Sequence, residues 1–178
     1  MTPPVKTLRR EILCYHPAMF AVISPYARFR EAPDLPALIE LYESNFVRVM
    51  RLAPELESLE GSVVSRVAGA LDLYLTVEER FKYTTSIVLT YRFDNEDGVD
   101  LEPRARIHVY HDVRAAEVVS HYRRRRSRRF ERWRSGHMPE VQRRWTMNRF
   151  LNKWLRFCAH QGHLFLGCTA AQVPDPGL

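Results

Sequence analysis

Hydrophobic side chains recur at steps of three and four residues between Leu35 and Val49. This spacing places them on one face of an α-helix. Asp34 is a suitable N-cap just before the pattern, and Pro54 cannot continue it. We therefore predict an amphipathic helix between these two residues, with an apolar stripe formed by Leu35, Leu38, Ile39, Tyr42, Phe46 and Val49.

After Gly61 the hydrophobic period changes to two, which is typical of half-buried antiparallel strands. Apolar and polar positions alternate over 71–78, 86–93 and 105–110, and a fourth strand is expected at 115–122. The polar residues 94–98 indicate a loop between the second and third of these strands. The pattern predicts a meander of about four strands.

A second amphipathic helix is expected between Val141 and Cys158, followed by Gly162 as its C-terminal cap. Helix, meander and helix predict an α+β fold in which the N-terminal and C-terminal helices pack with the antiparallel sheet. Each apolar face needs a cover, so one shared core is expected. Its predicted members are Leu38, Phe46, Leu73, Leu75, Ile87, Leu89, Ile107, Val109, Leu151 and Leu155.

The chain length of 178 residues suits a single domain with extensions. Five prolines in residues 1–33 predict an irregular N-terminal extension. We expect one α+β domain over residues 34–163 and a C-terminal tail over 164–178.

Three cysteines, an odd number without a close pair, argue against a secreted disulfide framework. The apolar stretch near the N-terminus is interrupted by charged residues, unlike a signal peptide, and no window approaches the length of a membrane span. These features predict a cytoplasmic protein without a membrane partner. Oligomeric state is not readable from the chain.

Eight arginines fall within residues 123–134 and dominate the net charge of +6. The other nineteen Lys and Arg residues face 21 acidic residues, so the rest of the chain is slightly acidic. Arginine binds phosphate bidentately, and Phe130 and Trp133 interleave with the run as in nucleic-acid contacts. The anion-binding candidates are Arg123, Arg124, Arg125, Arg126, Arg128, Arg129, Arg132 and Arg134.

Three interpretations of this basic segment stay open. It binds nucleic acid or another polyanion, it binds an acidic protein partner, or it is a solvated linker extended by self-repulsion.

Several stretches together resemble the bacterial YqiB-like family, domain of unknown function 1249. They are Ala37 to Phe46, Lys82 to Thr85, Val109 to Asp112 followed by Ala116 to Val118, and Asn148 to Leu155 with Cys158 and Gly162. The resemblance covers roughly residues 35–163 in the same order and implies no known activity. The chain departs from the family pattern in the turn before the last helix, where it has Ser135 to Met138, and at the start of that helix, where it has Gln142 to Arg144.

Tyr110, His111 and Asp112 offer an imidazole beside a carboxylate, which a general base or a small polar pocket would use. On a regular strand, however, His111 and Asp112 point to opposite faces. A structural hydrogen bond at the strand end is therefore the preferred interpretation.

Cys158, His160, His163 and Cys168 have the chemistry of zinc ligands, but Cys158 falls on the apolar stripe of the last helix. The chain has no nucleophile elbow, phosphate-binding glycine loop or His-Glu-x-x-His motif. We predict no catalytic residue, metal or cofactor. The expected function is a binding or accessory protein that engages an anionic partner. The alternative is a small-molecule-binding or hydrolytic domain centred on Tyr110, His111 and Asp112.

Overall fold

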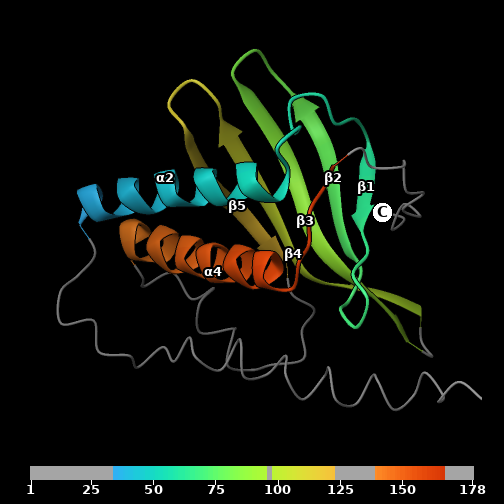
Figure 1. Ribbon diagram of the computed structural model, residues 1–178. Helices are drawn as coiled ribbons and strands as arrows, with labels where there is room; N and C mark the ends of the chain where they lie inside the picture. The colour runs from blue at the N-terminus through green and yellow to red at the C-terminus, as the bar shows by residue number, and fades with distance from the viewer. Residues whose placement is uncertain (1–33, 96–97, 123–138, 167–178) are drawn as a thin grey trace, which may run out of the picture. The chain divides into compact units, whose positions relative to one another are not determined.

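The computed structural model describes residues 34–95, 98–122 and 139–166 (Figure 1). The N-terminal extension, the basic segment 123–134 and the residues after 166 lie outside these ranges. The elements in chain order are α2 (Leu35–Leu52), β1 (Ser62–Ser65), β2 (Leu73–Arg80), β3 (Thr84–Asn95), β4 (Gly98–Tyr110), β5 (Ala115–Tyr122) and α4 (Glu140–His160).

The five strands form one antiparallel sheet in the order β1-β2-β3-β4-β5, so every strand pairs with its neighbour in the chain. Helices α2 and α4 lie side by side and run in the same direction (Figure 1). This arrangement confirms the predicted α+β fold with a helix from each end of the domain.

Helix α2 begins as predicted, because the backbone N–H of Ala37 donates to the Asp34 carboxylate at 2.9 Å. It ends at Leu52, just before Ala53 and Pro54. Leu38, Phe46 and Val49 are buried, but Leu35 and Ile39 are exposed. The apolar stripe is therefore buried only in part, since Leu35 and Ile39 face solvent although Leu38 between them is buried.

The meander has five strands instead of about four. The missed strand is β1, whose four residues pair with β2 from Ser62 opposite Thr76 to Ser65 opposite Leu73. Strands β3 and β4 also extend to Asn95 and Gly98, into the stretch that was expected to be a loop. Backbone pairing extends the hairpin there because ladder hydrogen bonds do not require apolar side chains.

Helix α4 ends at His160, and Gly162 follows in the left-handed region with φ of 88°. The N–H of His163 reaches back to the carbonyl of Cys158, closing the helix as the glycine predicted. The chain then packs on the domain: Phe165 is fully buried, and its N–H donates to the carbonyl of Leu52 at 2.8 Å.

One face of the sheet carries the core. Cross-strand pairing places Leu75, Leu89 and Ala105 on this face, one residue from each of three neighbouring strands. All ten predicted core residues are buried. In the described parts of the chain, neither helix has the length and apolarity that a membrane crossing requires.

Candidate functional site

A seam of amide side chains joins α2 to α4. Asn45 donates from Nδ2 to Asn148 Oδ1 at 3.2 Å, and Asn152 donates to Asn45 Oδ1 and to Ser44 Oγ, each at 3.0 Å. Asn45 and Asn148 are fully buried. Buried amides are tolerated only when their polar atoms are paired, so these contacts hold the two helices in one register.

The seam continues into the edge of the sheet. The pairing of β4 with β5 shifts at a bulge, where Arg106 faces Ser120 and Ile107 faces Val118. The backbone N–H of Val118 donates to Asn148 Oδ1 at 3.0 Å, and Asn148 donates from Nδ2 to the carbonyl of Arg144 at 2.9 Å. Asn148 therefore connects α2, α4 and β5.

A cluster of charged and phenolic groups lies one turn before Asn148 on α4. Glu117 of β5 accepts hydrogen bonds from Tyr110 Oη and Arg144 Nη1, each at 3.0 Å, and its side chain is only 13% exposed. Arg144 also donates to Glu140 at 2.8 Å. Burial, followed by the hydrogen bond to Glu117, raises the pKa of Tyr110 to about 12, so this phenol stays protonated and donating at neutral pH.

Tyr42 of α2 adjoins the same cluster. Burial raises the pKa of Tyr42, while Arg144 lowers it and Glu117 raises it. Its hydroxyl is buried without a hydrogen-bond partner among the residues that the structure describes. The cluster thus places the partly buried carboxylate of Glu117 between two phenols and an arginine.

His111 belongs to a different cluster, directly after β4. Its Nε2 lies 2.9 Å from Thr85 Oγ1, its Nδ1 lies 3.3 Å from a carboxylate oxygen of Glu57, and its ring packs edge-on against Phe46. Arg80 donates to Thr85 from the neighbouring strand end. His111 therefore makes a hydrogen bond at the strand end.

The three residues Tyr110, His111 and Asp112 diverge in the structure. Tyr110 bonds Glu117, His111 bonds Thr85, and Asp112 is exposed in the turn before β5. A small polar pocket built from all three stays a prediction, and these contacts do not bring the three side chains together.

The residues weighed as zinc ligands occupy separate places. Cys158 is fully buried beside the hydroxyl of Tyr91, with an Oη to Sγ distance of 3.3 Å, and burial raises the pKa of its thiol to about 12. His163 lies against Ser65 on β1, and His160 is exposed. No three His, Cys, Asp or Glu side chains of the described ranges are grouped to hold a metal ion, and Cys168 is beyond those ranges.

His163 provides a pH-dependent element of stability. Burial lowers the pKa of His163 below its ordinary value, which means that the folded protein favours the neutral ring. The unfolded chain then binds more protons below about pH 6.5, so stability falls as the pH decreases from there through the folded-state pKa. Between pH 7.5 and 5, the free energy of unfolding of His163→Gln should fall by less than that of the wild type. Urea titrations at several pH values measure this difference. The exposed His160→Gln should keep the wild-type pH dependence, and an unchanged dependence in both variants would contradict this role of His163.

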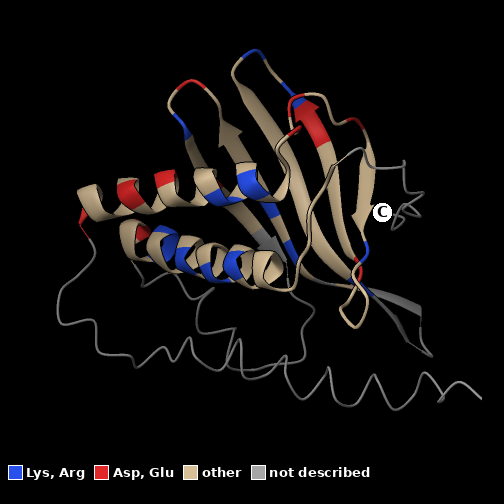
Figure 2. Ribbon diagram, in the orientation of Figure 1, with Lys and Arg blue, Asp and Glu red and all other residues tan. Residues whose placement is uncertain are grey.

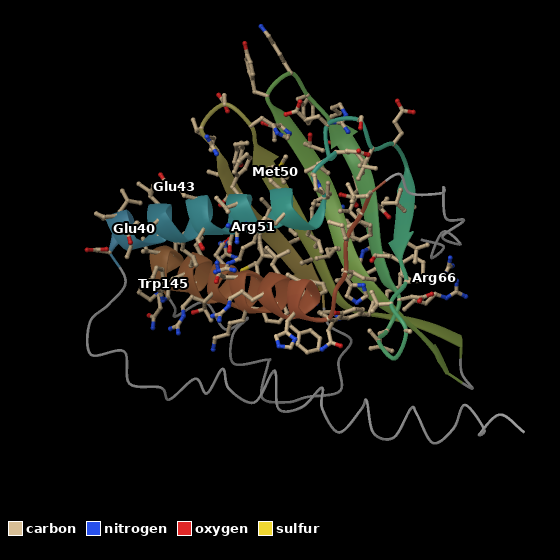
Figure 3. The ribbon with its side chains drawn as sticks, viewed as in Figure 1. Glu40, Glu43, Met50, Arg51, Arg66 and Trp145 are labelled. Atoms are coloured by element: carbon tan, nitrogen blue, oxygen red, sulfur yellow. The ribbon has the colours of Figure 1, made fainter. Side chains whose placement is uncertain are left out.

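A basic face lies on the C-terminal halves of the two helices. We define it by Arg48 and Arg51 of α2 with Arg149, Lys153 and Arg156 of α4. Figure 2 shows Lys and Arg along α4 and on the second half of α2, with acidic residues on the first half of α2. Figure 3 labels Glu40 and Glu43 at the acidic end and Arg51 at the basic end.

The acids of α4 do not balance this face. Glu140, at the first position, is the only acidic residue of α4, and it pairs with Arg143 and Arg144. Within the described ranges, no ion pair joins Arg48, Arg51, Lys153 or Arg156 to an acid. The arginine run 123–134, which was predicted to bind anions, is outside the described residues and precedes α4 in the chain.

The model of the family described as "Protein of unknown function (DUF1249)" matches residues 48–164. The chain belongs to this family. The match runs from the second half of α2 to the segment after α4, and therefore includes the sheet, Glu117, Asn148 and all five residues of the basic face.

The chain is also similar to "Uncharacterized protein YqiB" of Escherichia coli strains K12 and O157:H7. In both cases the identity is 29% over 133 residues, which cover 75% of this chain and 94% of the relative. No solved structure gives a significant match. The family match and the similarity to these relatives confirm the resemblance noted from the sequence.

Sequence reasoning did not single out Asn45, Glu117, Arg48 or Arg156. Asn45 and Asn148 carried a usable signal, because an Asn at an apolar-stripe position of each helix indicates a buried pair. The basic face had a weaker signal: the second half of α2 and the last twenty residues of α4 contain Lys and Arg but no acid.

Proposed function

We propose that this DUF1249 member is a cytoplasmic binding protein that engages an anionic partner through its arginine segment 123–134 and the basic face. The observation that carries the proposal is the uncompensated charge of this face, where Arg48, Arg51, Lys153 and Arg156 have no acidic partner in the described ranges. Cations without an acidic partner attract anions and accelerate their association.

The order of elements supports the same proposal. The arginine run connects β5, which ends at Tyr122, to α4, which begins at Glu140. Helix α4 then carries Arg149, Lys153 and Arg156 of the basic face from its third turn onward. A chain with this order offers successive cations to a repeating anion such as a nucleic-acid backbone.

The proposed partner is a polyanion bound through its phosphates. An acidic protein is the second candidate, because arginine also binds carboxylates bidentately. Phosphate is favoured because Phe130 and Trp133 interleave with the run and add stacking groups that a nucleic acid uses and an acidic peptide does not need.

The salt dependence of binding tests this function. Each phosphate contact releases condensed counterions, so about four contacts give a slope near −3.6 in log affinity against log salt on duplex DNA. Replacing Arg123, Arg124, Arg125 and Arg126 by Gln should flatten this slope and leave the thermal midpoint nearly unchanged. Fluorescence anisotropy with labelled duplex and differential scanning calorimetry provide the two measurements.

The control for this experiment is Arg66→Gln, which removes one exposed cation that is paired with Asp72 away from the helices. It should leave the slope within error of the wild type. Absence of retention on heparin or nucleic acid at low salt would refute the polyanion. Binding to an acidic peptide alone would point to the second candidate.

A further inference from the structure

Arg48, Arg51 and Arg156 converge at one place on the basic face. On α2, Ser44, Arg48 and Arg51 occupy one stripe, since they are separated by four and three residues. On α4, Asn152 and Arg156 likewise share a stripe. The hydrogen bond from Asn152 Nδ2 to Ser44 Oγ, at 3.0 Å, shows that the two stripes face each other.

The parallel course of the helices sets which residues meet next. Since α2 and α4 run in the same direction, the turn after Ser44 lies beside the turn after Asn152 (Figure 1). These turns carry Arg48 and Arg156. Burial, and then Arg156 and Arg51, lower the pKa of Arg48, as expected for neighbouring guanidinium groups that repel one another.

Arg48 is also incompletely satisfied. Its Nε is buried, and it has no hydrogen-bond partner among the residues that the structure describes. A buried donor without an acceptor costs free energy, and so does a pair of like charges. A group with several acceptor oxygens and a negative charge would remove both costs at once.

The ends of the helices explain only part of the arrangement. Cations are favoured beside the carbonyl groups of a helix C-terminus, and Arg51 lies in the last turn of α2. That effect falls off within the last turn, whereas Arg48 lies before the last turn and its Nε is buried. The helix ends therefore do not account for Arg48 and Arg156 together.

We propose that Arg48, Arg51 and Arg156 form a binding site for a single phosphate group, seated between the C-terminal halves of α2 and α4. The inference rests on the proposed function and names its ligand group: a phosphate of the bound polyanion, or the phosphate of a small metabolite, reaches the same three guanidinium groups. Lys153, on the same face, adds long-range attraction.

The test uses the full chain and inorganic phosphate as the probe, at constant low ionic strength. Isothermal titration and the shift of Tm should show that phosphate binds and stabilises the wild type, because a ligand of the folded state raises its stability. Arg48→Gln and Arg156→Gln should each weaken phosphate binding at least tenfold. Arg66→Gln, which makes the same change of charge elsewhere, should weaken it less than twofold.

A second measurement separates a ligand site from a structural role. Without phosphate, Arg156→Gln should raise Tm at low ionic strength, because it relieves repulsion with Arg48, and the gain should disappear at high salt. Arg156 is exposed, so its replacement removes little packing. A lower Tm of Arg156→Gln would mean that Arg156 stabilises the protein without phosphate, and would overturn the proposal. Circular dichroism checks folding of Arg48→Gln, and Arg156→Gln keeps the test valid if Arg48→Gln does not fold.

Comparison of ligands distinguishes the sources of the phosphate and the two proposals. If inorganic phosphate and an oligonucleotide compete for the wild type and this competition is lost in Arg48→Gln, the site binds a phosphate of the polyanion. Phosphate binding by a protein that binds no oligonucleotide would support a small-metabolite site and refute the proposed function alone. A third outcome would refute the phosphate site alone. In that case oligonucleotide binding depends on Arg123 to Arg126, and the affinity for phosphate is unchanged in Arg48→Gln and Arg156→Gln.

Discussion

Leu151→Ala is expected to lower the free energy of unfolding by about 2–5 kcal/mol. Leu151 is fully buried, as are Trp154 and Leu155 on the same face of α4. Removing its isobutyl group loses the transfer free energy of the buried carbons and leaves a cavity that neighbouring side chains only partly fill. Urea unfolding at equilibrium, followed by circular dichroism, measures the change.

Val141→Ala is the matched control for this prediction. Val141 lies in the first turn of α4 and is 38% exposed, so its replacement should change stability by no more than about 0.5 kcal/mol. A cost below about 1 kcal/mol for Leu151→Ala, close to that of the control, would contradict the packing of α4 against the core.

Asn148→Ala is expected to cost about 2–4 kcal/mol, because the buried N–H of Val118 loses its acceptor and Asn45 Nδ2 keeps only the backbone carbonyl of Asn148, at 3.4 Å. The side-chain oxygen of Asn148 accepts from Asn45 Nδ2 and from the backbone N–H of Val118. Water cannot easily replace it, since Asn45 and Asn148 have no exposed surface. The same urea titration measures the loss, and hydrogen exchange of the Val118 amide should become faster.

Asn152→Ala is the comparison within the same seam. Asn152 is only partly buried, and its removal leaves one hydrogen bond to Asn45 and one to Ser44 unmade, so a cost near 1 kcal/mol is expected. A double-mutant cycle of Asn45→Ala and Asn148→Ala should give a coupling energy of about 1 kcal/mol. Additive effects of these two changes would show that the seam contributes nothing as a pair.

The register of this seam connects stability to the proposed function. Asn45 and Asn148 fix how α2 lies along α4, and the same register brings Arg48 beside Arg156 on the following turns. A change that frees the helices to slide should therefore weaken phosphate binding without touching an arginine. The seam and the basic face are two consequences of one helix pairing.

The sequence by itself determined the local elements. The hydrophobic period of α2, the Asp34 cap and the Gly162 terminus placed both helices, alternation indicated the central strands, and a further strand was expected at 115–122, where the structure has β5. These features are local, because side-chain period and capping depend on residues within a few positions of one another. The predicted core followed from the same periods.

Only the tertiary structure decided which side chains meet. Strand β1 has four residues and too short an alternation to be seen, and it forms because β2 offers it a pairing edge. The divergence of Tyr110 and His111 depends on the different partners that Glu117 and Thr85 provide. Asn45 and Asn148 are separated by 103 residues, and Arg48 and Arg156 are farther apart still in the chain. No local period encodes such contacts, because they arise from the parallel packing of two helices that an entire sheet separates in sequence.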